Sequence, residues 1–337
     1  MRILLAPLSW LYALIITIRH ALYDHHILPS HAVTVPTICV GNLALGGTGK
    51  TPHIEYLIKL LTQNGFKLAV LIRGYKRATT GFIIADAKQS AKTIGDEAMQ
   101  LYTKFPNTTI AVCENRVKGI TLLQKYVDKL DVVLLDDAFQ HRALKCGLKI
   151  LLTTYDNLYK DDHMLPYGSL RDLPNRAQKA DIILVTKCPE SMRPIDMRVV
   201  DNKLALPVFQ QLHFTALQYS DINYQGIPLL VCGIAQPQYI IEYVKTKHPQ
   251  ALVMTFPDHY PYKESDVNNI VKQAEKVDFV ITTEKDIQRL NSTELSEKLQ
   301  AINIPLCVLP INVKFKTDAT TFDKKVITYI RENNRKK

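Results

Sequence analysis

Short, largely apolar runs alternate along the first part of the chain with segments whose apolar residues recur at helical spacing. Such runs are typical of strands that are buried on both faces of a parallel sheet. They lie at residues 68–72, 109–113, 131–135, 148–152 and 181–185. Residues 96–105 and 115–126 have a helical pattern. The alternation predicts an α/β fold with a doubly wound, mostly parallel sheet, whose ligands bind at the carboxyl ends of the strands.

The pattern changes near residues 205–226, where a polar stretch precedes a second α/β series. The apolar runs of this series lie at residues 227–232, 251–256, 278–283 and 305–310. We therefore expect a domain boundary near residue 218. The larger domain is predicted to cover residues 25–217, and a second, smaller α/β domain to cover residues 218–337.

The first 24 residues form an apolar segment that ends at Arg19 and His20. Its apolar run, from residue 3 to residue 18 with Pro7 and Ser9 as interruptions, is shorter than the roughly 20 residues that a helix needs to span a bilayer. Three interpretations stay open: a helix lying on a membrane surface, a buried core helix, and a true span or signal. Trp10 and Tyr12 favour the first, because aromatic side chains are stable at the depth of the lipid headgroups. Residues 1–24 are thus predicted to form a membrane-associating N-terminal helix.

Residues 36–52 contain the motif that indicates a chemistry most firmly. An apolar strand runs into a glycine-rich loop ending in Gly-Lys-Thr, and a helical pattern follows. Backbone N–H groups of such a loop bind phosphate oxygens, the lysine reaches the β- and γ-phosphates, and the threonine hydroxyl binds Mg²⁺. The predicted P-loop consists of Ala44, Leu45, Gly46, Gly47, Thr48, Gly49, Lys50 and Thr51. Ala44 stands where the strict pattern has glycine, which most easily adopts left-handed conformations.

Two acids, Asp136 and Asp137, end the apolar run that begins at residue 131. A carboxylate at the end of a strand near a P-loop typically holds Mg²⁺. Because neighbouring side chains of a strand point to opposite faces, we expect only one of the two to face the metal, and the sequence leaves open which one. Thr51 is the other predicted metal ligand.

Three more residues have both a structural and a chemical interpretation. Asp96 begins a helix, as either its N-cap or a base. His259 lies in the loop 256–262 among aromatic residues and prolines, where a single histidine is usually structural. Arg171 lies in the segment 168–171, in a loop after the strand-like run 148–152. It is either a phosphate-binding cation or a solvated turn residue.

The composition and net charge indicate a folded globular protein with an anionic partner. The 337 residues are 47% hydrophobic and 22% charged, which indicates a folded globular protein rather than a disordered one. The net charge of +10 favours an anionic partner such as a nucleotide, a phosphorylated substrate or an anionic membrane. Nothing in the sequence points to nucleic-acid recognition. The six cysteines are scattered without metal-ligand spacing, as in a reduced cytosolic protein.

Taken in order, the motifs resemble those of the tetraacyldisaccharide 4′-kinases of lipid A biosynthesis. The resemblance extends from the N-terminal helix to about residue 290, and it rests on these segments: VGNLALGGTGKTP, RGYKR, GDEA, DDAFQHR, GSLRD, FPDHYPY and TTEKD. The family usually has glycine where this chain has Ala138.

The resemblance implies that the γ-phosphate of ATP is transferred to the 4′-hydroxyl of a tetraacylated glucosamine disaccharide 1-phosphate. It implies that Lys50 and the loop hold the phosphates and that Arg171 binds an anionic group. Thr51 and the Asp136-Asp137 pair would hold Mg²⁺, and Asp96 would be the base, oriented by His259. It further implies a monomer that meets its lipid substrate at the cytoplasmic face of the inner membrane of a Gram-negative-type bacterium, as a peripheral or monotopic protein.

Two functions of other classes stay open from the residues alone. A P-loop NTPase could couple hydrolysis to a protein partner, although Pro189 stands where a guanine-reading loop has an acid. A membrane-bound binding module with an inactive nucleotide site is the other. The fate of the γ-phosphate distinguishes a kinase from both.

Overall fold

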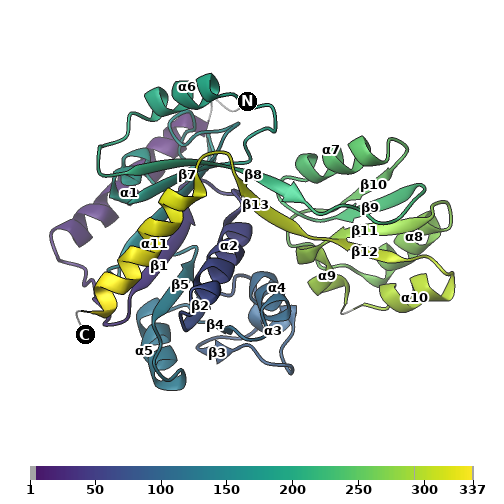
Figure 1. The fold of residues 1–337 in the computed structure, drawn as a ribbon, viewed down its shortest axis with the longest axis horizontal. Helices are drawn as coiled ribbons and strands as arrows, with labels where there is room; N and C mark the ends of the chain where they lie inside the picture. The colour runs from purple at the N-terminus through teal and green to yellow at the C-terminus, as the bar shows by residue number, and fades with distance from the viewer. Residues whose placement is uncertain (1–4, 292, 336–337) are drawn as a thin grey trace.

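The structure, a computed structural model, describes residues 5–291 and 293–335 and contains two separate β-sheets (Figure 1). The large sheet has nine strands in the order β13-β8-β7-β6-β1-β5-β2-β4-β3, and only β3 and β13 run antiparallel to their neighbours. Its strands are β1 (Thr37–Asn42), β2 (Leu68–Ile72), β3 (Ile83–Ile84), β4 (Thr109–Val112), β5 (Val132–Asp136), β6 (Leu148–Thr154), β7 (Ile182–Thr186), β8 (Gln211–Tyr219) and β13 (Ile311–Phe315). This arrangement confirms the predicted doubly wound, mostly parallel α/β fold.

The small sheet is parallel throughout, with the order β10-β9-β11-β12. Its strands are β9 (Pro228–Cys232), β10 (Leu252–Thr255), β11 (Phe279–Thr283) and β12 (Leu306–Leu309). Helix α7 (Gln238–Lys247) packs on one face of this sheet, and the other face is covered by α8 (Glu264–Ala274), α9 (Glu284–Leu290) and α10 (Leu295–Ala301).

Helices cover both faces of the large sheet. One face carries α2 (Lys50–Gln63), α4 (Asp96–Lys104) and α11 (Ala319–Asn334), with the short α3 (Ala91–Ile94) leading into α4. The opposite face carries α1 (Ala6–Asp24), α5 (Arg116–Tyr126), α6 (Pro194–Leu204) and the 3₁₀ helix Pro174–Lys179. Residues alternate between these two layers along each strand: Ile38 and Val40 of β1 pack under α2, whereas Cys39 packs under α5. Burial of both faces explains why the strands are nearly continuous apolar runs.

The C-terminal segment differs from the predicted division at residue 218. Strand β13 pairs antiparallel with β8, and α11 inserts Phe322, Val326 and Ile330 into the same core as α2. Their spacing of four residues places all three side chains on one face of α11. We therefore propose a smaller domain that is inserted between β8 and β13, so that the chain passes twice between the two sheets (Figure 1).

Helix α1 lies against the large sheet on one side only. Tyr12 and Ile16 join the core beneath α6, but Trp10 is 73% exposed. The other large apolar residues of this helix that are exposed are Leu8, Leu11, Leu14, Ile15 and Ile18. Within the described residues, no helix is both long and apolar enough to cross a membrane.

Polar contacts tie the inner side of α1 to two loops of the large domain. The buried His20 has Nε2 2.6 Å from Asp172 Oδ1, and Arg142 donates to the backbone oxygen of His20 over 2.8 Å. The Tyr12 hydroxyl donates to the backbone oxygen of Arg171 over 3.1 Å. The apolar outer side of α1 thus stays exposed on a helix that is firmly attached.

Candidate active site

A cleft of about 590 Å³ lies between the carboxyl ends of the strands of the two sheets. Residues 44–52, Arg73, Asp136, Asp137 and Arg171 line it from the large sheet. From the small domain it is lined by Leu309 and by residues of three segments, 234–240, 258–259 and 283–285. The eight predicted P-loop residues therefore share one cavity with Asp136, Asp137 and His259.

The P-loop connects β1 to α2, and two of its glycines have left-handed backbones, Gly46 with φ of 102° and Gly49 with φ of 86°. Ala44 is not among the residues with positive φ. Its neighbour Leu45 donates its backbone N–H to Ser169 over 2.7 Å, so this part of the loop runs extended beside residues 169–170. An alanine fits there without strain, which explains how the chain departs from the strict motif.

Asp137 is held by two cations of the cleft. Arg171 Nη1 donates to its Oδ2 over 2.9 Å, Arg171 Nη2 donates to its Oδ1, and Lys50 Nζ lies 3.6 Å from Oδ1. Burial opposes ionisation of this carboxyl, but Lys50 and Arg171 outweigh burial and lower its pKa. Asn42, which is fully buried, accepts from Lys50 over 3.3 Å and from Arg171 over 2.6 Å through Oδ1. The positions of both cations are thus fixed by Asp137 and Asn42.

Asp136 has a different environment at the end of β5. Burial raises its pKa to about 7, and its Oδ1 has no hydrogen-bond partner among the described residues. A buried carboxylate oxygen without a partner is costly unless a cation or donor approaches it. Asp137 has a φ of 51° and lies beyond the strand, so the alternation expected for a strand does not apply, and both acids line the cleft. The expectation that only one of them faces the metal stays a prediction.

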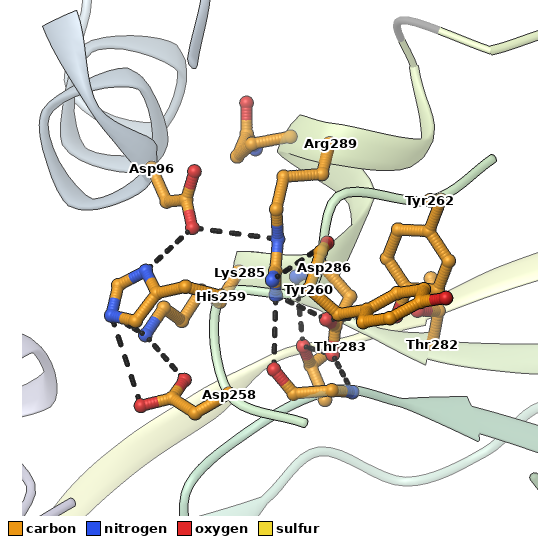
Figure 2. A network of polar contacts seen from close by, with 12 residues as sticks. Asp96, Asp258, His259, Tyr260, Tyr262, Thr282, Thr283, Lys285, Asp286 and Arg289 are labelled. Atoms are coloured by element: carbon orange, nitrogen blue, oxygen red, sulfur yellow. Dashed lines mark hydrogen bonds and ion pairs between the residues drawn. The ribbon is translucent and has the colours of Figure 1, made fainter. Parts of the chain in front are cut away.

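Asp96 and His259 meet across the two domains (Figure 2). His259 Nδ1 lies 3.0 Å from Asp96 Oδ2, and Arg289 Nε approaches the same oxygen at 3.4 Å. Burial opposes ionisation of Asp96, but His259 and Arg289 prevail and lower its pKa, so the group is a carboxylate at neutral pH. His259 and Glu97 line the cleft, whereas Asp96, with a side chain that is 11% exposed, lies directly behind them.

A second contact between the domains lies behind this pair. Lys104, at the end of α4, is 2.7 Å from Glu55 Oε2 of α2 and 2.6 Å from Glu284 Oε1 of α9. Gln100 donates to the other oxygen of Glu55 over 2.9 Å. Because the Glu55 side chain is only 2% exposed, removal of Lys104 would leave a buried charge unpaired. The helix that carries Asp96 is thus fixed to both the P-loop helix and the small domain.

Comparison with known proteins identifies the family of this chain. The sequence model of tetraacyldisaccharide-1-P 4′-kinase (LpxK) matches residues 1–331. The chain belongs to the tetraacyldisaccharide 4′-kinase family. Curated relatives named tetraacyldisaccharide 4′-kinase include one from Bacteroides thetaiotaomicron, 41% identical over 98% of this chain and 94% of the relative. One from Flavobacterium johnsoniae is 42% identical over 99% of this chain and 98% of the relative.

A solved structure of the same family has the same fold. LpxK from Aquifex aeolicus, crystallised in complex with ATP, superimposes with a TM-score of 0.73 at 26% identity and covers 98% of this chain and 99% of its own. These matches confirm the family that the motifs indicated. They also support ATP as the nucleotide of this 4′-kinase family member.

Some residues of the site were not predicted from the sequence. No role was predicted for Asn42, although its side chain accepts hydrogen bonds from both Lys50 and Arg171 and donates one to Thr48. Glu97 and Lys285 lie in predicted motifs and line the cleft beside His259. The signal for Lys285 was its position directly after β11, where a strand end faces the ligand.

His53 braces the P-loop of this kinase from beneath. Its Nδ1 is 2.7 Å from the backbone oxygen of Gly49, which can only accept, so Nδ1 carries the proton. Its Nε2 is 3.0 Å from Thr215 Oγ1 of β8 and accepts from that hydroxyl. Burial lowers the pKa of His53 to about 4, so the ring stays neutral.

Because His53 is neutral and buried, we expect the free energy of unfolding to fall as the pH is lowered. Between the unfolded pKa of about 6.5 and the folded pKa of about 4, only the unfolded chain binds the proton. Lowering the pH from about 7 to about 4 therefore costs about 3 kcal/mol of unfolding free energy at this residue. Urea unfolding at both pH values should show this loss in the wild type and its absence in His53→Gln.

His25→Gln, which alters an exposed histidine at the end of α1, is the matched control and should follow the wild type. A pH dependence of His53→Gln equal to that of the wild type would mean that His53 does not remain neutral in the folded protein.

Proposed function

We propose that this chain transfers the γ-phosphate of ATP to the 4′-hydroxyl of a tetraacylated glucosamine disaccharide 1-phosphate. The observation that carries the proposal is the shared cleft, which the P-loop of the large domain lines together with His259 of the small domain, while Asp96 lies directly behind this histidine. Lys50 and the loop N–H groups hold the β- and γ-phosphates, and Arg171 stabilises the negative charge of the transferring group. Arg73 and Lys76 add positive charge to the same cleft for an anionic acceptor.

Phosphoryl transfer breaks the bond between the γ-phosphorus and the bridging oxygen, whose electron pair stays on ADP. A new bond forms between phosphorus and the sugar oxygen, and the hydroxyl proton moves to Asp96. Since His259 and Arg289 both contact Oδ2 of Asp96, Oδ1 is the oxygen that we assign to the hydroxyl. A carboxylate suffices as the base, because this reaction depends mainly on alignment and charge neutralisation.

The residues present fit Mg²⁺. Asp136 Oδ1 is buried without a protein partner, and the available donors are hard oxygens. We assign the ion to Thr51, Asp136 and Asp137. A site with only two carboxylates is usual for Mg²⁺ that also binds substrate phosphates. When bound, the ion neutralises charge on the β- and γ-phosphate oxygens.

The reaction requires both domains in contact. Asp96 comes from α4 of the large domain and His259 from the small domain, and Lys104 links the same two parts. All these groups belong to a single chain, which supports a monomer as the active unit.

Incubation with ATP labelled on the γ-phosphate and the tetraacyldisaccharide 1-phosphate tests this function. We expect the label to appear on the lipid, and only when the lipid is present. Release of the label as inorganic phosphate, with none on the lipid, would instead support a hydrolase that acts with a protein partner.

We further propose that α1 binds the surface of the membrane that holds the lipid acceptor. Its exposed apolar residues, led by Trp10 and Leu14, face away from the protein, while its inner side is fixed to the loops that carry Arg171 and Asp172. Because ATP is the donor, we place the protein on the cytoplasmic face of the inner membrane.

Replacing Trp10 and Leu14 together by glutamate should weaken partition to anionic phospholipid vesicles by roughly tenfold or more, because each buried side chain contributes about 1.5–3 kcal/mol. Vesicle sedimentation measures the bound fraction. Tyr126→Glu, at a 64% exposed residue of α5, is the control and should bind as the wild type does. Equal loss in both variants would point to charge alone rather than to insertion of α1.

A further inference from the structure

Lys285 lies in the first turn of α9, and its side chain reaches His259, which pairs with Asp96 across the two domains (Figure 2). Its ammonium nitrogen is 3.0 Å from Asp258 Oδ1 and 3.3 Å from Glu97 Oε1. The third neighbour is the Nε2 atom of His259, at 3.1 Å. Lys285 thus contacts the side of the imidazole ring that faces away from Asp96.

The number of donors fixes the direction of these contacts. A lysine ammonium has three N–H donors and no acceptor. Two of them match the carboxylates of Asp258 and Glu97, and the third points at His259 Nε2, which must therefore accept. A proton on Nε2 would place two donors against each other. The proton of the neutral ring is consequently on Nδ1, which donates to Asp96.

The geometry points to Lys285 as a positioning residue that holds His259 neutral and protonated at Nδ1, with its N–H directed at Asp96. This inference rests on the proposed function for the role of Asp96. With Nε2 occupied, His259 cannot take the proton of the acceptor hydroxyl, so that proton goes to the Asp96 carboxylate. The histidine then acts only as a donor that orients the base.

The charged groups around His259 determine whether its ring is neutral or protonated. Asp96 and Glu97 face the ring from α4, Asp258 from its own loop, and Tyr75 stacks edge-on at 5.6 Å between ring centroids. Three carboxylates favour the imidazolium, and Arg289, whose Nε lies 3.4 Å from Asp96 Oδ2, offsets part of their charge. Lys285 opposes the imidazolium charge from within hydrogen-bond distance, and it remains a cation because Glu97 and Asp258 raise its pKa against the effect of burial.

The backbone beneath Lys285 is rigid enough to place a flexible side chain. The next residue, Asp286, is fully buried and accepts from Thr283 Oγ1 over 2.6 Å and from the Gly233 N–H over 3.0 Å. Thr283 in turn caps α9 by accepting from the Asp286 N–H over 2.9 Å. These bonds fix the first turn of α9 on the end of β11.

The tautomer is measured directly by ¹⁵N NMR of the histidine side chains in the full-length protein near neutral pH. The signal of His259 is the one absent from His259→Gln. We expect a protonated Nδ1 and an unprotonated Nε2. An Nε2-protonated ring or an imidazolium in the wild type would overturn the inference without any need for a lysine variant.

The variant Lys285→Met should convert a large part of His259 to the imidazolium or to the Nε2-protonated tautomer. With the cation gone, we expect the acid limb of the pH profile of kcat to move upward by roughly one pH unit, and the KM for ATP to stay unchanged. Lys285→Arg keeps a donor and a charge and should restore most of the wild-type tautomer.

Lys298→Met, which alters an ion-paired lysine of α10 away from the cleft, is the matched control and should leave tautomer and pH profile unchanged. An unchanged tautomer in Lys285→Met would reject the positioning role. A wild-type protein that has the expected tautomer but transfers no phosphate to the lipid would reject the proposed function and leave the tautomer assignment intact.

Discussion

Asp96→Asn is expected to lower kcat for phosphate transfer to the lipid by roughly 10²–10⁴-fold, the range that a positioned general base contributes. The amide keeps the shape of the side chain and can still accept from His259 Nδ1. It cannot take up the proton of the sugar hydroxyl. The affinity for ATP should not change, because Asp96 lies behind the cleft lining rather than in the P-loop.

Transfer of labelled γ-phosphate to the lipid measures kcat, and calorimetric titration with ATP measures binding. Asp201→Asn, at an exposed residue of α6, is the control for the same chemical change. Glu97→Gln is the decisive comparison, because Glu97 lines the cleft next to His259. A larger loss of kcat in Glu97→Gln than in Asp96→Asn would mean that Glu97, and not Asp96, is the base.

Lys50→Met is expected to reduce kcat/KM by roughly 10²–10³-fold, as removal of one preorganised donor to a developing charge does. Its ammonium group is positioned before ATP binds, by Asn42 at 3.3 Å and by Asp137 at 3.6 Å. The fold should survive, because Asp137 keeps its pairing with Arg171. ATP binding should weaken as well, since the lysine of a P-loop typically contacts the β- and γ-phosphates of the bound nucleotide.

The matched control is Lys59→Met, which removes a lysine from the same helix. Its ammonium contacts Asn312 over 2.8 Å on the exposed side, far from the P-loop end of α2. Steady-state kinetics with both substrates should show wild-type values for this control. Comparable losses in the two variants would mean that α2 itself was damaged.

The features that could be predicted from the sequence are those determined by neighbouring residues. The P-loop needs only a strand, a glycine-rich turn and a helix in succession, and all three are visible along the chain. Helix α4 likewise begins at Asp96, as its pattern indicates. Ala44 could not be judged, because its extended conformation depends on pairing with residues near Ser169, far away in sequence.

The residues that could not be predicted depend on contacts between distant segments. Lys285 touches Glu97 only because α9 and α4 are brought together across the domain boundary. The alternation of a strand was assumed for both Asp136 and Asp137, but Asp137 lies beyond β5 and has a left-handed backbone that no local pattern indicates. The return of β13 and α11 to the large sheet was missed for the same reason, since an amphipathic helix does not reveal which sheet it covers.

That return has a consequence for biosynthesis. Residues 228–309 contain every strand of the small sheet and leave the ribosome before β13 and α11. Domains generally fold as units during synthesis, so the small sheet can form while the P-loop side of the molecule still lacks an edge strand and a covering helix. The core of the nascent nucleotide-binding half is therefore completed only after β13 and α11 have been synthesised. Premature termination near residue 310 would leave part of this apolar core exposed to water.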